Sequence, residues 1–159
     1  MRKILSLVRG IGLPALVFCA AGLSCDDTGD NYLKGSVVKN YHIKYNDVRV
    51  RLYDGELSVE YTSNATEGNI ALGVTINTNQ VELAKGKTYN LMKYGAVYRD
   101  LGFGNLPELQ SGDLTLSEYS GKNGGEVSGS FAAKFVSPTG SLQNLRGGFS
   151  ADLEVVDPS

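Results

Sequence analysis

The sequence predicts an all-β protein, and three observations support this prediction. Apolar and polar residues alternate with a period of two along several segments, which is the pattern of half-buried strands. The chain carries 20 glycines, nine tyrosines and no tryptophan, a composition that suits many turns and half-buried strands. No segment beyond the first 31 residues shows a sustained helical period. We therefore expect an antiparallel β-sandwich of about eight to ten strands, with a small closed β-barrel as the alternative.

The first residues have the features of a secretory leader. Arg2 and Lys3 supply a positive end, an apolar run covers residues 11–21, and a short border follows it. The apolar run is shorter than the roughly 20 residues that a membrane-spanning helix needs. Residues 1–24 are therefore expected to form a helical signal peptide that is removed.

A cysteine stands directly after the expected cleavage point. The border Gly22-Leu23-Ser24-Cys25 resembles a bacterial lipoprotein signal, although the aliphatic residue stands two places before the cysteine and the family has it three places before. The resemblance implies that Cys25 becomes the acylated N-terminus. It also implies export to the cell envelope, either at the outer membrane or on the periplasmic face of the inner membrane. Cys19 is the competing cysteine, and an ordinary signal peptide that happens to contain two cysteines is the alternative.

Cleavage before Cys25 leaves 135 of the 159 residues, which is enough for one domain with a single core. We assign residues 25–31 to an acidic tether and residues 32–157 to a single β domain. The leader takes three of the 15 Lys and Arg residues and none of the 17 Asp and Glu residues, so the remaining balance is 12 against 17, or −5. Nucleic acid is therefore not an expected partner. The single remaining thiol would be a liability in an export compartment, and acylation would use it.

The clearest strand pair lies on either side of Asp54-Gly55. Asp-Gly between two alternating segments predicts a two-residue type I′ turn. Counting outward from this turn places Arg49 opposite Glu60 on a face that we expect to be exposed. The other face then collects three apolar pairs, which are Leu52 with Leu57, Val50 with Val59 and Val48 with Tyr61.

Further alternating segments predict the remaining strands. These segments are residues 70–77, 81–84, 88–92 and 114–117. A long C-terminal hairpin is expected across Pro138-Thr139-Gly140. Its inward residues would be Val127, Phe131, Ala133 and Phe135 on one strand, and Phe149, Ala151, Leu153 and Val155 on the other.

The sequence offers no recognisable catalytic constellation. His42 is the only histidine, and we place it on the solvent face of a strand because it alternates with Tyr41 and Ile43. No Ser-His-Asp or Cys-His arrangement can be built around it, and His and Cys ligands for a metal are missing. We therefore expect no catalytic residue, no metal site and no cofactor. Carboxylates that meet only in space leave a hydrolase of envelope polymers as an alternative.

One long stretch, Tyr94–Gln110, fits neither strand alternation nor an ordinary turn. A segment of this length between strands is usually functional or disordered, and its aromatic residues argue against disorder. Aromatic and arginine side chains dominate the contact energy of interfaces. Tyr94, Tyr98, Arg99 and Phe103 are therefore the candidate partner-binding residues. The alternative is that these side chains fold back and plug one end of the domain.

These observations predict an envelope lipoprotein that is not an enzyme and that is held to the membrane through its N-terminal lipid. It would act as a binding, adhesion or structural module, with an envelope protein or a polysaccharide as its partner. A lipocalin-like carrier of a small ligand is a further alternative. The absence of tryptophan weakens it, because lipocalins begin with a Gly-x-Trp motif.

Overall fold

The computed structural model describes residues 31–63 and 69–156. The leader, Cys19, Cys25 and all of the predicted tether except Asn31 lie outside the described residues, as does the last predicted domain residue, Asp157. The described part holds two short helices, α1 (Ser36–Asn40) and α2 (Leu91–Tyr94), and one turn of 3-10 helix, η1 (Leu101–Phe103). Its nine strands are β1 (Tyr32–Lys34), β2 (Asp47–Tyr53), β3 (Glu56–Thr62), β4 (Ile70–Asn77), β5 (Thr88–Asn90), β6 (Gly95–Tyr98), β7 (Glu108–Tyr119), β8 (Glu126–Val136) and β9 (Leu142–Val155).

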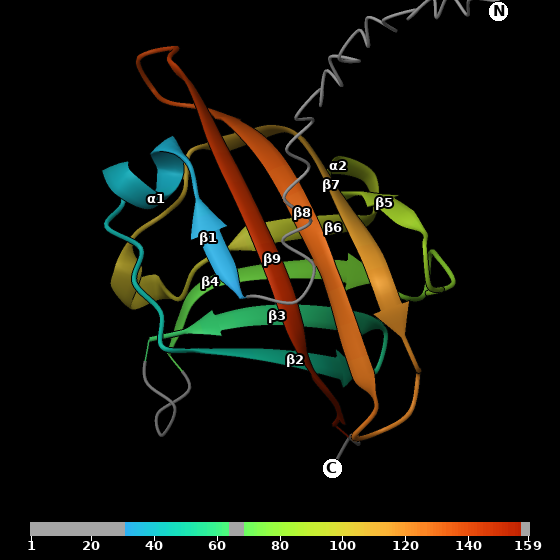
Figure 1. The fold of residues 1–159 in the computed structure, drawn as a ribbon. Coiled ribbons are helices and arrows are strands. Elements are labelled where there is room, and N and C mark those ends of the chain that lie inside the picture. The colour runs from blue at the N-terminus through green and yellow to red at the C-terminus, as the bar shows by residue number, and fades with distance from the viewer. Residues whose placement is uncertain (1–30, 64–68, 157–159) are drawn as a thin grey trace, which may run out of the picture.

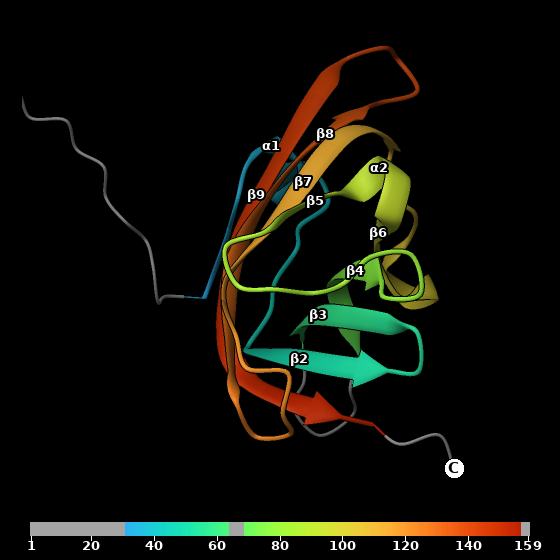
Figure 2. The same ribbon diagram turned by 90° about the vertical axis from the view of Figure 1, so that its right-hand side faces the viewer.

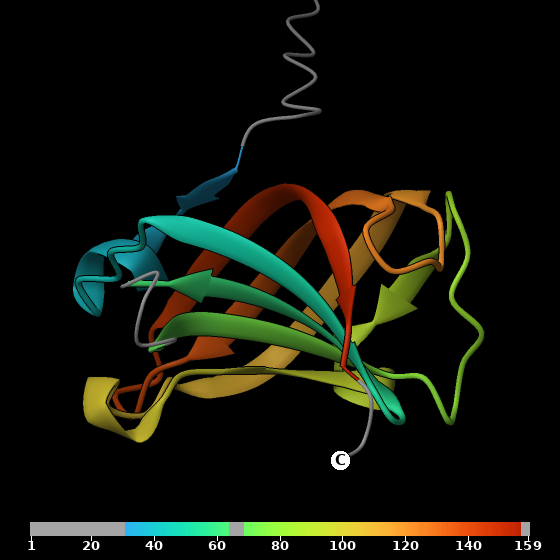
Figure 3. The ribbon, with the colours of Figure 1, turned by 90° about the horizontal axis from the view of Figure 1, so that it is seen from below.

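The strands form one continuous sheet that curls until it is nearly closed. The strand order is β5-β7-β8-β9-β2-β3-β4-β6, and β1 pairs with β9 beside this path. Every described pairing is antiparallel except that of β2 with β9. The long strands β7, β8 and β9 cross over β2, β3 and β4 (Figure 1), and the view from below shows how the sheet curls round (Figure 3). The all-β prediction is confirmed, and the architecture is that of the barrel alternative.

Strand β9 joins the two layers. It pairs with β8 from Leu142 to Asp152 along one edge. Along its other edge it borders β1 at Arg146–Gly148 and then β2 at Leu153–Val155. A strand of 14 residues spans roughly 45 Å at about 3.3 Å per residue, so it is long enough to run through both layers. The change of partner along β9 makes one sheet from what would otherwise be two.

The two edge strands, β5 and β6, are connected through α2 within the single segment Thr88–Tyr98. The side chain of Asn90 caps α2 by accepting a hydrogen bond from the Lys93 amide at 3.0 Å. Leu91 of this helix is fully buried and packs in the core. Figure 2 shows α2 between the layers at the open side of the sheet. A short helix with one buried leucine therefore lies at the gap that the edge strands leave.

Tyr61 connects the layers through the interior. Its ring is fully buried and meets Tyr45 edge-on at 5.0 Å and Phe131 at 6.1 Å between centroids. Its hydroxyl donates a hydrogen bond of 2.7 Å to the Gly148 carbonyl on β9. Burial raises the pKa of the Tyr61 hydroxyl far above its ordinary value, so it remains a donor throughout the physiological range.

The predicted β2–β3 register is confirmed: Val50 pairs with Val59, and Arg49 with Glu60. Two details of the prediction are wrong. Of the two central turn residues, Gly55 has a positive φ (83°) and Asp54 does not, whereas a type I′ turn needs it at both. A left-handed Asp54 would carry a steric cost that glycine avoids. Glu60 is also not exposed, since only 3% of its surface is accessible.

Two other predictions are corrected. Residues 81–84 form no strand, and β5 pairs with β7; the Tyr89 hydroxyl instead accepts a hydrogen bond from the Ala84 amide at 2.8 Å. His42 is exposed as predicted, but it lies in a turn after α1 at a φ of 49°. The turn forms because the Ile43 amide bonds to the Val38 carbonyl at 3.0 Å, which lets Ile43 reach the core without a strand.

The C-terminal hairpin is confirmed as the pair β8–β9. Its tip projects beyond the rest of the molecule (Figures 1 and 2). Ala151 and Val155 are partly buried against the core. The other six residues predicted to point inward are buried, and these are Val127, Phe131, Ala133, Phe135, Phe149 and Leu153.

We predict that Tyr61→Phe lowers the free energy of unfolding by about 1–3 kcal/mol, because it leaves the buried Gly148 carbonyl without this donor. Tyr45→Phe is the matched control, since it removes a hydroxyl that bonds the Asn31 carbonyl at an exposed site. Its cost should stay below roughly 0.5 kcal/mol. Urea denaturation of both variants measures the difference. The reverse ranking would show that the Tyr61 hydroxyl does not couple the layers.

Candidate functional site

Polar side chains that are sheltered from solvent cover the outside of β2, β3, β4 and β6. Residues that alternate with the core residues of these strands point outward, yet Ser58, Glu60 and Thr75 are buried. On an ordinary solvated sheet face such residues would be exposed. We call this surface the outer polar layer. Its members are Arg51, Tyr53, Glu56, Ser58, Glu60, Thr75 and Tyr98.

Tyr98 covers the middle of the outer polar layer. It stands opposite Gly73 in the β4–β6 pairing, and a Cβ atom on Gly73 would overlap its ring. Because glycine leaves this space open, the ring lies across β4 and its hydroxyl comes within 3.3 Å of Ser58 Oγ on β3. Burial raises the pKa of Tyr98; the hydrogen bond with Ser58 opposes this shift, and the negative charge of Glu60 adds to it.

Glu60 is held by two neighbours on β2. The Tyr53 hydroxyl donates to Glu60 Oε1 at 3.4 Å, and Arg51 Nη1 lies 3.8 Å from Glu60 Oε2. Arg51 Nη1 in turn donates to the Tyr53 hydroxyl at 3.1 Å, while its Nε contacts Glu154 Oε2 at 2.9 Å. One guanidinium therefore connects a sheltered carboxylate on β3 with an exposed one on β9.

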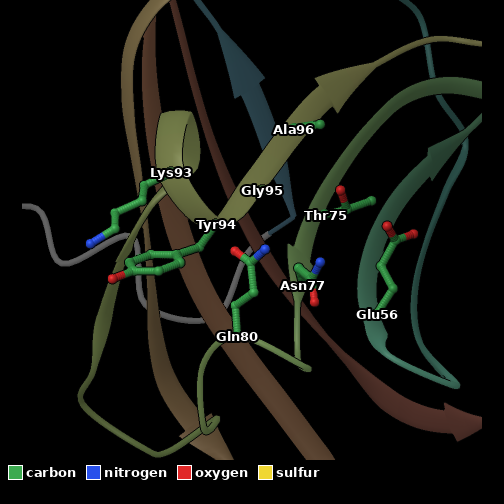
Figure 4. Close-up of a pocket in the computed structure, with 8 residues that line it drawn as sticks. All are labelled: Glu56, Thr75, Asn77, Gln80, Lys93, Tyr94, Gly95 and Ala96. Atoms are coloured by element: carbon green, nitrogen blue, oxygen red, sulfur yellow. The ribbon is translucent and has the colours of Figure 1, made fainter.

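An open pocket of about 220 Å³ adjoins the outer polar layer at its α2 end. Figure 4 shows Gln80 and Asn77 between the Tyr94 ring and the carboxyl group of Glu56. The Lys93 ammonium lies 4.8 Å from the centroid of the Tyr94 ring. The lining residues come from β3, β4, α2, β6 and the loop after β4, and they are Glu56, Thr75, Asn77, Gln80, Lys93, Tyr94, Gly95 and Ala96.

The Glu56 carboxyl group has a shifted proton affinity. Burial raises its pKa, a hydrogen bond with Thr75 opposes the shift, and the charge of Glu60 adds to it. A carboxylate accepts hydrogen bonds, a primary amide both donates and accepts, and an ammonium group donates. The pocket thus offers several polar groups of different kinds beside one aromatic ring. Polar groups at fixed positions orient a polar ligand in a binding site.

The four predicted partner-binding residues lie in two places. Tyr94 lines the pocket and Tyr98 belongs to the outer polar layer, so one face of the molecule brings them together. Arg99 and Phe103 pack against each other elsewhere, with 5.1 Å between the guanidinium carbon and the ring centroid. Arg99 donates to the carbonyls of Ala71 at 2.8 Å and Phe103 at 3.0 Å. Burial lowers its pKa, and its hydrogen bonds tie the η1 segment to β4.

The stretch Tyr94–Gln110 is also more regular than predicted. It contains the end of α2, the whole of β6, the η1 turn and the start of β7. Alternation failed to reveal β6 because the strand has only four residues and its glycine must approach the Thr75 carbonyl closely. The partner-binding role of these residues stays a prediction.

Sequence reasoning did not identify Glu56, Glu60 or Gln80 as site residues. The hairpin pattern did place Glu60 on the face away from the core, a face that was expected to be exposed. It could not show that this face is sheltered, because the shelter comes from Tyr98, a residue distant in the sequence that reaches Ser58 only across Gly73.

Within residues 31–63 and 69–156, no three or more His, Cys, Asp or Glu side chains gather closely enough to hold a metal ion. The described helices include none that is long and apolar enough to cross a membrane. Comparisons of the chain with protein-family models, with curated proteins and with solved structures find no match.

We predict that burial, and not distance, decides which acid beside Arg51 stabilises the fold. Glu60→Ala should cost about 1–3 kcal/mol, because Tyr53 and Arg51 lose a sheltered acceptor. Glu154→Ala should cost less than about 1 kcal/mol despite its shorter contact of 2.9 Å, because 52% of its side chain is exposed, against 4% for Glu60. Chemical denaturation of both variants provides the comparison, and equal costs would contradict it.

Proposed function

We propose that the protein is a lipid-anchored binding module of the bacterial cell envelope and that its ligand is a polysaccharide. Cys25 is the proposed attachment point. The pocket at Tyr94 and the outer polar layer beside it form the proposed binding surface. The observation that carries the proposal is the composition of this pocket, in which an aromatic ring, two amides, a carboxyl group and an ammonium group line one open hollow.

A sugar ring fits this chemistry. Its C–H face can lie on the Tyr94 ring, and its hydroxyl groups can both donate and accept hydrogen bonds with the Asn77 and Gln80 amides and the Glu56 carboxyl group. The volume of about 220 Å³ is below the roughly 300–1,000 Å³ of pockets that enclose a whole drug-sized ligand. A pocket of this size suits one unit of a chain, and its open form lets the chain continue over the surface.

The hydrolase alternative has weaker support. Glu56 and Glu60 are the acids of the outer polar layer. Glu60 is occupied by Tyr53 and Arg51. These contacts favour binding of a polymer over its cleavage.

The carrier alternative has weaker support as well. Large side chains occupy the interior of the sheet, and Tyr61, Phe135 and Leu57 are among those that are fully buried. In lipocalin-like barrels the interior is the ligand cavity. The pocket at Tyr94, by contrast, opens on the outside of the sheet (Figure 4).

We predict that Tyr94→Ala weakens binding of envelope polysaccharide about tenfold or more, because it removes the aromatic face of the pocket. Met92→Ala is the matched control: Met92 belongs to the same helix and is 55% exposed, but it does not line the pocket. Neither substitution should change the melting temperature by more than an ordinary surface substitution does. Affinity electrophoresis through gels that contain purified envelope polysaccharides measures the binding.

Two results would contradict this function. The first is that the unaltered protein migrates at the same rate with and without each polysaccharide. The second is that Tyr94→Ala and Met92→Ala bind equally well while both remain folded. Capture of an envelope protein by the same surface would instead favour a protein partner.

A further inference from the structure

The pocket at Tyr94 carries a hydrogen-bond acceptor and a donor on two neighbouring side chains. Glu56 on β3 stands directly opposite Asn77 on β4. Both side chains point outward, because the adjacent residues Leu57 and Ile76 are buried in the core. Residues that stand directly opposite each other have Cβ atoms about 4.5–5.5 Å apart. The two side chains therefore act as one unit of the pocket, which we call the Glu56–Asn77 pair.

A hydrogen bond within the turn after β4 decides which end of the Asn77 amide is available. The backbone N–H of Asn79 donates to Asn77 Oδ1 at 3.0 Å, so the side chain closes an Asx turn. The amide carries its two donors on the nitrogen, and this turn does not use them. Asn77, which lines the pocket, therefore offers a ligand chiefly a donor.

Glu56 supplies the opposite function. A carboxylate only accepts hydrogen bonds, and its two oxygens have about four lone-pair directions. The hydrogen bond with Thr75 uses part of this capacity. Ala96 stands opposite Thr75 on β6 and lines the same pocket, so its methyl group adds a small apolar contact. The pocket thus combines an acceptor, a donor and an apolar group over three adjacent strands (Figure 4).

We propose that the polysaccharide is built from N-acetylated amino sugars and that the Glu56–Asn77 pair holds the acetamido group. This inference rests on the proposed function. An acetamido group is a secondary amide, and in its trans form the N–H and the C=O point in opposite directions. The N–H donates to the Glu56 carboxylate, and the carbonyl accepts from the Asn77 nitrogen. The methyl group contacts Ala96, and the sugar ring lies against Tyr94.

Other saccharide groups match the Glu56–Asn77 pair less well. The carboxylate of an acidic sugar only accepts hydrogen bonds, and the Glu56 carboxylate repels it. Lys93 lines the pocket and is exposed, where solvent and salt weaken its attraction for an acidic sugar. A protonated amino group only donates, so it suits Glu56 but not the nitrogen of Asn77. A hydroxyl can donate or accept, but it lacks the two opposed groups of an amide.

Three tetrasaccharides that differ in one substituent of each ring test this selection. They are the tetramers of N-acetylglucosamine, glucose and glucosamine in the same linkage, which carry an acetamido, a hydroxyl or an amino group at the same carbon. Isothermal titration calorimetry measures their binding to the full chain. We expect the N-acetylated tetramer to bind about tenfold or more tightly than either of the others, because only its substituent satisfies both members of the pair.

The variant Asn77→Asp tests the donor by itself. Its carboxylate still accepts from the Asn79 N–H, so the turn is kept, but the donor nitrogen becomes an acceptor. The preference for the N-acetylated tetramer over the glucose tetramer should be lost. Asn79→Asp is the matched control, because it adds the same charge to the same turn and Asn79 does not line the pocket. This control should keep the preference. The comparison of the three ligands on the unaltered chain remains decisive if a variant does not fold.

The results separate this inference from the proposed function. Equal binding of the N-acetylated and glucose tetramers, or tightest binding of the glucosamine tetramer, overturns the acetamido selection and leaves a polysaccharide-binding pocket standing. A preference that survives Asn77→Asp overturns the role of the Glu56–Asn77 pair. If no tetramer binds but a polysaccharide gel retards the protein, the inference alone fails. If no tetramer binds and no gel retards the protein, the proposed function fails with it.

Discussion

The structure depends on a change of pairing partner along one edge of β9, from β1 to β2. Its first half borders β1 and its last residues border β2, while β8 follows its other edge up to Asp152. Gly147 and Gly148 leave room for the rings of Phe131 on β8 and Tyr32 on β1, which Cβ atoms there would overlap. The bare backbone also lets the Tyr61 hydroxyl reach the Gly148 carbonyl. Without this crossing the molecule would be two separate sheets, and neither outer surface would hold its place relative to the other.

The crossing gives the molecule two outer surfaces of different chemistry. On the layer of β2, β3 and β4, sheltered polar groups and an aromatic-lined pocket offer hydrogen bonds of several kinds. On the layer of β7, β8 and β9, Arg146, Asp113 and small side chains such as Ala132 line two shallow hollows. A polar layer of satisfied hydrogen bonds is rigid, which suits selective recognition.

The sequence predicted the features that depend on neighbours in the chain. Asp54-Gly55 and the alternation around it were enough for the β2–β3 register, and Pro138-Thr139-Gly140 for the β8–β9 hairpin. The turn at Asp54-Gly55 and the turn at His42 are local features that it missed, but the larger omissions depend on residues far apart in the sequence. No local pattern encodes the parallel β2–β9 pairing, the contact of Tyr98 with Ser58, or the pairing of Lys34 with Arg146. For the same reason two predicted site residues, Tyr94 and Tyr98, share a face, while Arg99 and Phe103 do not join them.

Hydroxyl-radical footprinting of Tyr94 and Tyr32 tests the central claim, which is that the pocket beside the outer polar layer binds an envelope polysaccharide. Both tyrosines are partly exposed, and of the two it is Tyr94 that lines this pocket. Added envelope polysaccharide should slow the oxidation of Tyr94 and leave that of Tyr32 unchanged. Unchanged oxidation of Tyr94, or protection of Tyr32 alone, would contradict the account.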